Sequence, residues 1–351
     1  MKKMKLLAIL LAMVMVAAAC SSDASTTDSN AGGDADSGDA DSGDADSGDA
    51  DSGDDTEDVA VAQGGDLEFH VITHGDSGTF WSVVERAVND AEAQFGITVN
   101  YFGANNDAAA QSQAIEQAIA DGSDGIAISL ADPDGLESAA QAVTAAGIPL
   151  YTLNSGSNDF TRLGGVSHFG QDERVAGQGA GLRFNELGAT SVLCAFQEQS
   201  NVGLEERCGG LADTFEGTVV NEFIGLDAEP EAQVSGIVAA LNANPDVDAV
   251  LGTGPNVPIR ALEAGENTGT DLIIGSFDLS EELINEIEAG NIAFTVDQQQ
   301  YLQGYLPVVA MFLQATNQNT IGGGNPILTG PGFVTPDNAA AVATLVGEGT
   351  R

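Results

Sequence analysis

From Asp66 onward, short apolar runs rich in β-branched and aromatic residues alternate with longer segments of helical pattern. This alternation is the signature of βαβ units, and it predicts parallel sheets covered by helices, an α/β fold. The predicted strands fall into two consecutive series separated near residue 170. The first series is 67–73, 97–102, 125–129 and 148–153, and the second is 191–196, 218–223, 248–252, 271–277 and 292–297.

Two series predict two doubly wound lobes, because a single open twisted sheet seldom grows that wide. A chain of 351 residues is also long enough for more than one core. In open α/β sheets, ligands bind at the carboxyl ends of the strands. Two lobes that face each other across those ends would form a ligand-binding cleft.

The N-terminus carries the only lysines of the chain, followed by the apolar run LLAILLAMVMVAAA, which ends just before Cys20. The run is too short for a membrane-spanning helix and is typical of an export signal. It resembles the lipobox of bacterial lipoproteins, although Ala17 stands where leucine is commoner. Residues 1–19 are therefore predicted to be a lipoprotein signal peptide, with Cys20 lipidated on the outer face of the cytoplasmic membrane. The alternative is a simple secretory signal.

Residues 20–65 are almost wholly Asp, Ser, Gly, Ala and Thr, with GDADS repeated in tandem. Such a segment cannot bury enough apolar area to fold, so we predict a disordered acidic tether. Its aspartates lack the spacing and the final glutamate of a calcium loop, and we expect no metal site. The net charge of -43 repels phosphate backbones and anionic lipids. We therefore expect no nucleic-acid partner, and membrane contact through the lipid anchor only.

Two cysteines remain after the signal, Cys194 and Cys208. Export places them in an oxidising compartment, where a disulfide is favoured. The bridge requires the loop between them to fold back. The alternative is two buried thiols that act as small apolar side chains.

Eight segments follow one another in an order and at a spacing that resemble the periplasmic sugar-binding proteins related to ribose-binding protein. The resemblance covers Asp66 to about Pro336, and the LEERC and DQQQYLQGYLPV pieces are most similar to a sugar-binding-like subgroup of uncertain ligand. The segments are ITHGDSGTFWSVVERAVNDAEAQFGITVNYFG, ADGSDGIAISLADPDGL, AAGIPLYTLNSGS, GQDERVAGQGAG, NVGLEERCGGLADTF, NPDVDAVLGTGPN, IIGSFDLS and FTVDQQQYLQGYLPV.

The resemblance implies a type I periplasmic binding protein fold, in which the chain crosses between the lobes three times and hinge closure traps the ligand. It places the N-terminal lobe at 66–169 plus 300–325, and the C-terminal lobe at 170–298 plus 326–346. The implied protein is a monomeric, extracytoplasmic solute-binding component of an ABC importer, without a cofactor. It would capture a sugar, polyol or amino sugar and deliver it to the membrane permease.

Phe80 and Trp81 match the family's aromatic pair that sandwiches the sugar ring, and the alternative for both is packing of the helix onto the sheet. His74, at the end of the first strand, is expected to bond a hydroxyl or to be structural. Asn154 and Ser155 stand where the family often has an Asp-Arg pair, which favours a ligand other than ribose.

Arg207 lies near the position of the family's ligand-binding arginine, but Glu205 matches that position itself more closely. An acidic side chain there would suit a ligand with an amine. Asn201 is a second candidate in the same helix, with simple helix capping as the alternative. Asn256 matches a loop in which the family has an asparagine. Asp278 and Gln298 match two family positions at strand ends and suit a polyol, because a carboxylate accepts from hydroxyls and an amide both donates and accepts. Hinge and turn roles are their alternatives.

A secreted α/β enzyme is the main competing class. The sequence has no Gly-x-Ser-x-Gly elbow, and His70, His74 and His168 have no metal-ligand partners at helical spacing. GQGAG, at 177–181, falls inside a predicted helix, which indicates helix packing instead of dinucleotide binding. We therefore predict no enzyme. A sensor that presents its ligand to a membrane receptor is a further alternative, whereas the export signal argues against a DNA-binding repressor.

Overall fold

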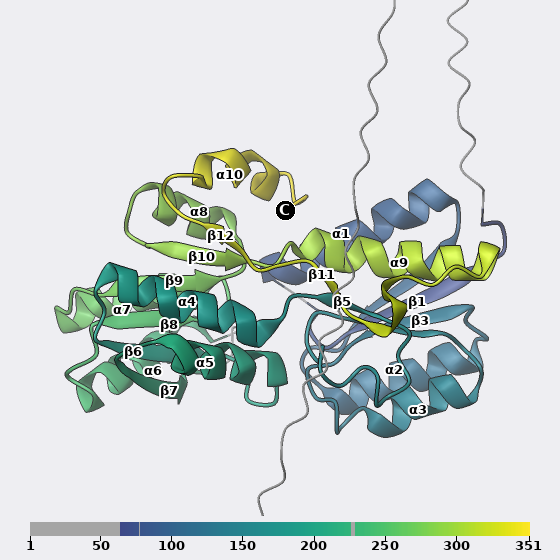
Figure 1. Ribbon diagram of the computed structural model, residues 1–351, viewed down its shortest axis with the longest axis horizontal. Coiled ribbons are helices and arrows are strands. Elements are labelled where there is room, and N and C mark those ends of the chain that lie inside the picture. The colour runs from purple at the N-terminus through teal and green to yellow at the C-terminus, as the bar shows by residue number, and fades with distance from the viewer. Residues whose placement is uncertain (1–63, 77, 226–228) are drawn as a thin grey trace, which may run out of the picture. The chain divides into compact units, whose positions relative to one another are not determined.

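The computed structural model describes residues 64–76, 78–225 and 229–351 (Figure 1). The predicted signal peptide, Cys20 and the predicted tether up to residue 63 lie outside these ranges. Across the described ranges, no helix is both long enough and apolar enough to cross a membrane.

The first lobe is built on a six-stranded parallel sheet with the strand order β11-β5-β4-β3-β1-β2. Helices α1 and α9 cover one face and α2 and α3 the other (Figure 1), each over its own apolar core. The strands are β1 (Glu68–Thr73), β2 (Thr98–Gly103), β3 (Gly125–Ser129), β4 (Leu150–Leu153), β5 (His168–Gly170) and β11 (Ile327–Leu328). The helices are α1 (Gly78–Phe95), α2 (Ala108–Ala120), α3 (Glu137–Ala145) and α9 (Gln300–Asn317).

The second lobe has a six-stranded sheet with the order β12-β10-β9-β8-β6-β7, parallel except for β12. One apolar core lies under α4 and α5, and another under α6, α7, α8 and α10. The strands are β6 (Ser191–Phe196), β7 (Thr218–Phe223), β8 (Ala249–Gly252), β9 (Ile273–Phe277), β10 (Phe294–Asp297) and β12 (Gly332–Val334). The helices are α4 (Glu173–Leu187), α5 (Val202–Thr214), α6 (Pro230–Ala243), α7 (Val257–Thr268), α8 (Glu281–Glu288) and α10 (Ala339–Gly347), and the short 3-10 helix η1 (Gly322–Gly324) precedes β11.

The two-lobe α/β architecture predicted from the strand pattern is confirmed. Each predicted strand is present, but β5, β11 and β12 were not predicted, because strands of two or three residues are too short to show a hydrophobic period. The chain crosses between the sheets at 171–172, at 298–299 and at 329–331. Since β11 pairs with β5, the third crossing follows Leu328 and not the predicted boundary at residue 325.

A disulfide joins Cys194 in β6 to Cys208 in α5, with 5.8 Å between their Cα atoms. Both residues are buried in the core beneath α4 and α5. The bridge therefore ties helix α5 to β6, the strand next to the edge strand β7 of the second sheet.

Glycines bring α4 and α5 into backbone contact. A Cβ atom on Gly177 would lie 2.1 Å from the carbonyl oxygen of Arg207, and one on Gly210 would lie 2.1 Å from that of Arg174. No side chain fits such distances, so the helix-packing role predicted for GQGAG is confirmed. This close approach sets Glu173, at the start of α4, beside Arg207 of α5.

The last residues of the chain contact both lobes. Arg351 directs Nε and Nη2 at the Oδ2 atom of Asp297, at 2.7 Å each. The Asp297 side chain is fully buried at the second crossing, and its Oδ1 accepts the backbone N–H of Gln299 at 2.8 Å. Arg86 of α1 donates to the carbonyl oxygen of Glu348. The 348–351 segment thus supplies a positive charge to the buried carboxylate at the second crossing.

Gly177→Ala is expected to lower the free energy of unfolding by about 1–3 kcal/mol, because the methyl group forces two backbones apart. Gly347→Ala is the matched control: its Cβ meets nothing within 4 Å, so the change should stay within about 0.5 kcal/mol of zero. Urea unfolding of both variants measures the difference. An equal loss of unfolding free energy in the two variants would show that α4 and α5 are not packed through Gly177.

Arg351→Ala is expected to destabilise the fold by about 1–3 kcal/mol, because it leaves the buried carboxylate of Asp297 without its cation. Arg183→Ala serves as the control, since Arg183 pairs with the exposed Glu186 within one helix, and such pairs contribute about 0.5 kcal/mol or less. The measurement is the midpoint of urea unfolding. A control as damaging as Arg351→Ala would contradict the assignment.

Candidate functional site

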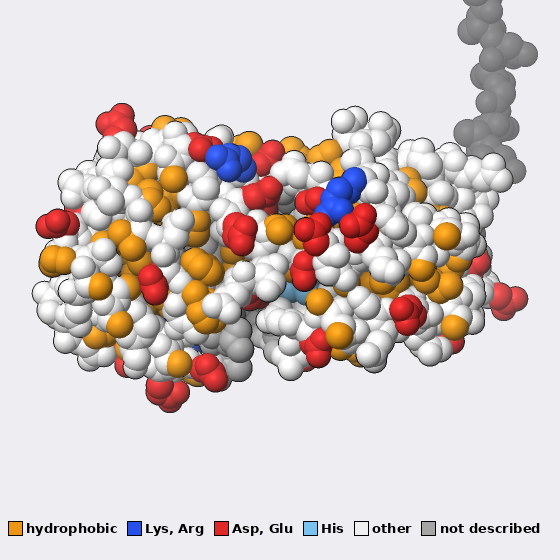
Figure 2. All heavy atoms as spheres, turned by 90° about the horizontal axis from the view of Figure 1, so that it is seen from below, with side chains coloured by type: hydrophobic (Ala, Val, Ile, Leu, Met, Phe, Trp, Pro, Cys, Tyr) orange, Lys and Arg blue, Asp and Glu red, His pale blue; other side chains and the backbone are white. Residues whose placement is uncertain are grey.

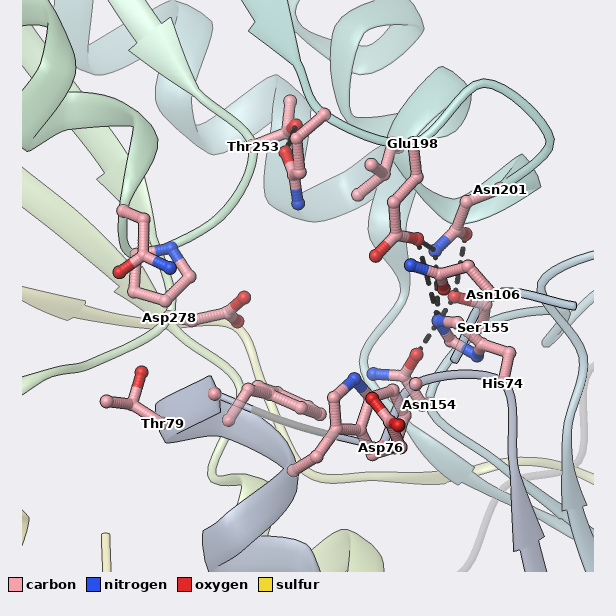
Figure 3. Close-up of a pocket in the computed structure, with 18 of the residues that line it drawn as sticks. His74, Asp76, Thr79, Asn106, Asn154, Ser155, Glu198, Asn201, Thr253 and Asp278 are labelled. Carbon is pink, nitrogen blue, oxygen red and sulfur yellow. Dashed lines mark hydrogen bonds and ion pairs between the residues drawn. The ribbon is translucent and has the colours of Figure 1, made fainter. Parts of the chain in front are cut away.

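A cavity of about 290 Å³ is lined by side chains of both lobes at the carboxyl ends of their strands. His74 follows β1, and Asn154 and Ser155 follow β4, whereas Asp278 follows β9 and Gln298 follows β10. In the close-up, Glu198, Asn201 and His74 gather on one side, and Asp278 lies across the cavity from them (Figure 3). The space-filling view shows a histidine side chain between the two halves of that face (Figure 2).

The structure brings nearly all of the predicted ligand-binding residues to this cavity. The lining includes His74, Phe80, Trp81, Asn154, Ser155, Asn201, Arg207, Asn256, Asp278 and Gln298. Glu205 is the exception, because its side chain is exposed and lies outside the lining. The expectation that Glu205 places a carboxylate in the cleft is therefore wrong in position. The ligand contacts of the other ten stay predictions.

Phe80 and Trp81 are both part of the apolar core and of the cavity wall. Each is only 8% exposed, and their rings meet edge to face with centroids 4.9 Å apart. A Cβ on Gly75 would lie 1.9 Å from Nε1 of Trp81, so only glycine lets the indole lie against this loop. Trp81 also contacts the His74 ring edge-on at 4.8 Å. Packing and ligand contact are therefore compatible roles for this pair.

Asn154 and Asp278 adopt left-handed backbone conformations, with φ of 65° and 69°. Asparagine and aspartate tolerate this region better than other residues with a side chain. In each case the conformation follows directly on the last residues of a strand. Such local strain gathers at binding sites, where it directs a side chain that an extended strand would point elsewhere.

Arg207 is engaged by the protein itself. Its Nε and Nη2 donate to both carboxylate oxygens of Glu173 at 2.6 and 2.9 Å, and Nη1 donates to the carbonyl oxygen of Thr253 at 2.6 Å. Burial lowers the pKa of Arg207, but the charges of Glu173 and Asp278 outweigh burial and raise it overall. The guanidinium also lies over the Phe277 ring at 4.5 Å. Arg207 is thus held as a fixed charge beside the cavity.

Asp278 is a buried carboxylate whose charge is only partly compensated. Its Oδ1 accepts Nε2 of Gln298 at 2.6 Å, and its Oδ2 lies 3.6 Å from Nη1 of Arg207. Burial raises the pKa of Asp278 to about 6, although Arg207 and Gln298 act in the opposite direction. A ligand hydroxyl that donates to Oδ2 would supply the missing partner.

His74, Glu198 and Asn201 form a polar cluster on the other side of the cavity. Glu198 Oε2 accepts Asn201 Nδ2 at 2.6 Å and lies 3.6 Å from His74 Nε2. His74 Nδ1 is 2.8 Å from Ser129 Oγ in the first lobe, and Ser155 Oγ donates to Asn201 Oδ1 at 2.9 Å. Burial raises the pKa of Glu198, but its bonds to His74 and Asn201 outweigh burial and lower it. These contacts join the two lobes.

Asn201 also caps helix α5, because its Oδ1 accepts the N–H of Gly203 at 2.9 Å. The capping alternative is therefore correct for this side chain, whatever else it contacts. Both of its polar ends are occupied by protein groups.

Several lining residues were not predicted, among them Glu198, Gln197 and Thr253. The signal that could have found them is position alone, since each follows the carboxyl end of a strand, β6 or β8. Asp76, Asn105 and Asn106 line the cavity from loops of the first lobe, and Thr79 from the first turn of α1. Within the described residues, no group of His, Cys, Asp and Glu side chains could hold a metal ion.

The comparisons with known proteins agree with this geometry. The profile of the periplasmic binding protein domain family matches residues 69–319. A carbohydrate transporter of Acidothermus cellulolyticus 11B, solved in complex with myo-inositol, is 36% identical, with a TM-score of 0.79 and coverage of 82% of this chain and 100% of that one.

Two characterised relatives are more distant. A xylose/arabinose-binding protein of Sulfolobus acidocaldarius is 25% identical over 76% of this chain and 70% of its own length. A ribose import binding protein of Bacillus subtilis is 23% identical over 66% of this chain and 76% of its own.

The raised pKa of Asp278 predicts how the ligand-free stability depends on pH. Between about pH 4 and the folded pKa of about 6, the folded state binds more protons than the unfolded state, so stability falls as pH rises. Asp278→Asn removes this titration. As pH rises from about 4 to 7, the free energy of unfolding of the variant is expected to increase by about 1–3 kcal/mol relative to that of the wild type. Urea unfolding across this range measures the difference.

Asp248→Asn provides a control of opposite sign. Burial raises the pKa of Asp248, but hydrogen bonds from Thr190 and Ser191 outweigh burial and lower it. This variant should therefore lose stability relative to the wild type as pH rises through the carboxylate range. If Asp278→Asn behaves in the same way, Asp278 is not a destabilised carboxylate.

Proposed function

The chain belongs to the periplasmic binding protein family, and on that premise we propose that it is the extracytoplasmic solute-binding component of an ABC importer that captures a neutral polyol. The observation that carries this proposal is the cavity at the strand ends of both lobes, which combines an aromatic pair with buried amides and carboxylates. Apolar ring faces and hydroxyl groups need this combination. The carbohydrate transporters among its relatives support the same role.

The charges of the cavity favour a ligand rich in hydrogen-bond donors. Asp76, Glu198 and Asp278 contribute carboxylates, whereas the only guanidinium in the lining, that of Arg207, is held by Glu173 and Thr253. An anionic sugar would meet repulsion at three carboxylates and would find little free positive charge. A neutral polyol can donate to Asp278 and accept from the remaining N–H groups of Asn154 and Gln298.

The size of the cavity and one relative favour a cyclic polyol. About 290 Å³ lies at the small end of ligand pockets, which suits a single six-membered ring. The Acidothermus protein, 36% identical to this chain, is known in complex with myo-inositol. We therefore propose myo-inositol or a closely related cyclitol as the ligand, ahead of an amino sugar, because the relative binds a neutral cyclitol and the Glu198 carboxylate already accepts a bond from Asn201.

We also propose that the protein is exported and carries a lipid on Cys20, with residues 20–65 as the tether. In this proposal the protein is a monomer that delivers its ligand to a membrane permease. The acidic groups on the face in Figure 2 are spread among neutral atoms, with the few basic side chains beside them.

Thermal-shift measurements test the ligand class. Myo-inositol should raise the melting temperature, because a ligand that binds only the folded state adds about 2.7 kcal/mol of stability at 100 times its Kd. D-glucuronate should have no effect. Stabilisation by amino acids or nucleosides, with no effect of any polyol or sugar, would contradict the proposal.

Asp278→Asn should weaken the binding of myo-inositol by about 10-fold or more, because a charge-assisted hydrogen bond contributes about 1.5–3 kcal/mol. Glu222→Gln, a neutralised carboxylate on the exposed side of β7, should bind as the wild type does. Isothermal titration calorimetry gives both dissociation constants. A lower affinity together with unchanged or higher stability would mark Asp278 as a binding residue and not a structural one.

A further inference from the structure

Gln303 of α9 is fully buried behind the cavity wall and does not line the cavity. Its side chain nevertheless contacts two residues that do. Nε2 donates to Oε1 of Gln298 at 2.7 Å, and Oε1 accepts Nδ2 of Asn154 at 3.2 Å. Nε2 also lies 3.1 Å from Oγ1 of Thr329 at the third crossing. One amide therefore joins the floor of the cavity to two segments of the hinge.

The two ends of an amide are not equivalent, so Gln303 determines which way its neighbours face. Gln298 has its Oε1 turned to the donor of Gln303, and this leaves its Nε2 for the carboxylate of Asp278 at 2.6 Å. Asn154 has its Nδ2 turned to Gln303, and its Oδ1 lies 3.0 Å from Ser155 Oγ, whose single hydrogen is shared between Asn154 and Asn201. Each then keeps one further N–H for the cavity.

The opposite orientation of Gln298 would place its Oε1 against Asp278. Two acceptors at hydrogen-bond distance repel each other, and an unpaired buried carboxylate is costly. The donor of Gln303 prevents this arrangement because it requires an acceptor at the same place. The pattern of donors and acceptors in the cavity floor thus depends on a residue that no ligand reaches.

We propose that Gln303 is a positioning residue for ligand binding, which fixes the amide orientations of Gln298 and Asn154 and so the carboxylate of Asp278. Only the effect on ligand affinity rests on the proposed polyol-binding function. The effect on the amide orientations concerns the ligand-free protein and does not depend on which ligand binds.

Two substitutions separate orientation from support. Gln303→Met keeps the length of the side chain and removes both polar ends. Gln303→Glu keeps an acceptor for Asn154 but has no donor for Gln298, so Gln298 is expected to turn its Oε1 towards Asp278. Gln314→Met is the matched control: it lies in the same helix, and its Oε1 accepts only the hydroxyl of Tyr151 at 2.6 Å, away from the cavity.

The first readout is the titration midpoint of Asp278 in the ligand-free protein, followed by carbon-13 NMR of its carboxyl group and assigned with Asp278→Asn. Gln303→Met leaves the atoms of the Gln298–Asp278 bond in place but removes the donor that holds Oε1 of Gln298. The Gln298 amide can then rotate, which should weaken its bond to Asp278 and move the midpoint upward by about half a pH unit. Gln314→Met should leave it unchanged. A merely structural role for Gln303 would not move this midpoint.

The second readout is the Kd for myo-inositol, measured by calorimetry on variants whose folding is checked by urea unfolding. Gln303→Met should raise the Kd by about 10-fold, Gln303→Glu by more, and Gln314→Met by less than about twofold. An unchanged midpoint in Gln303→Met overturns the proposal, as does wild-type affinity in Gln303→Glu. If the wild type does not bind myo-inositol, the proposed ligand is wrong, and the midpoint still decides the role of Gln303.

Discussion

The buried ion pair between Arg207 and Glu173 is the contact on which the cavity depends. Glu173 begins α4 directly after the first crossing, and Arg207 lies in α5, so the pair forms only because glycines let these helices touch. The pair leaves Nη1 of the guanidinium 3.6 Å from Oδ2 of Asp278 and fixes a positive charge in the cavity wall. Without that charge, burial would raise the pKa of Asp278 further. The carboxyl group would then be neutral over a wider pH range, and a neutral carboxyl group is a weaker acceptor for ligand hydroxyls.

The same arrangement lowers the stability of the ligand-free protein. Asp278 combines a left-handed backbone, near-complete burial and a pKa raised to about 6. Each feature destabilises the free protein, and a donor that reaches the carboxylate offsets the cost of burying its charge. The ligand therefore gains affinity from a carboxylate that is incompletely bonded when the cavity is empty.

The strand and helix pattern predicted the two-lobe fold because burial on both faces gives long parallel strands a strong apolar signal. Position at strand ends, together with the family resemblance, also led to Asp278, Gln298 and Asn154. The pattern could not show that Glu198, in the loop before α5, lines the cavity, or that Glu205 lies on the exposed side of α5. Nor could it show that Arg207 is occupied, or that Gln303 orients its neighbours, since both depend on contacts between segments distant in sequence.

The contacts between the lobes suit a hinge that closes on a ligand. Ser155 with Asn201, Asn158 with Glu206, and the backbone N–H of Val202 with the carbonyl of Ala131 are all polar. Each such bond adds only about 0.5–1.5 kcal/mol, because water replaces it when the lobes separate. A polyol bonded to Asp278 of one lobe and Asn154 of the other would add contacts that exist only in the closed form. The closed form would then be populated mainly when the ligand is bound. A membrane partner that recognises the closed form would therefore receive the ligand-bound protein.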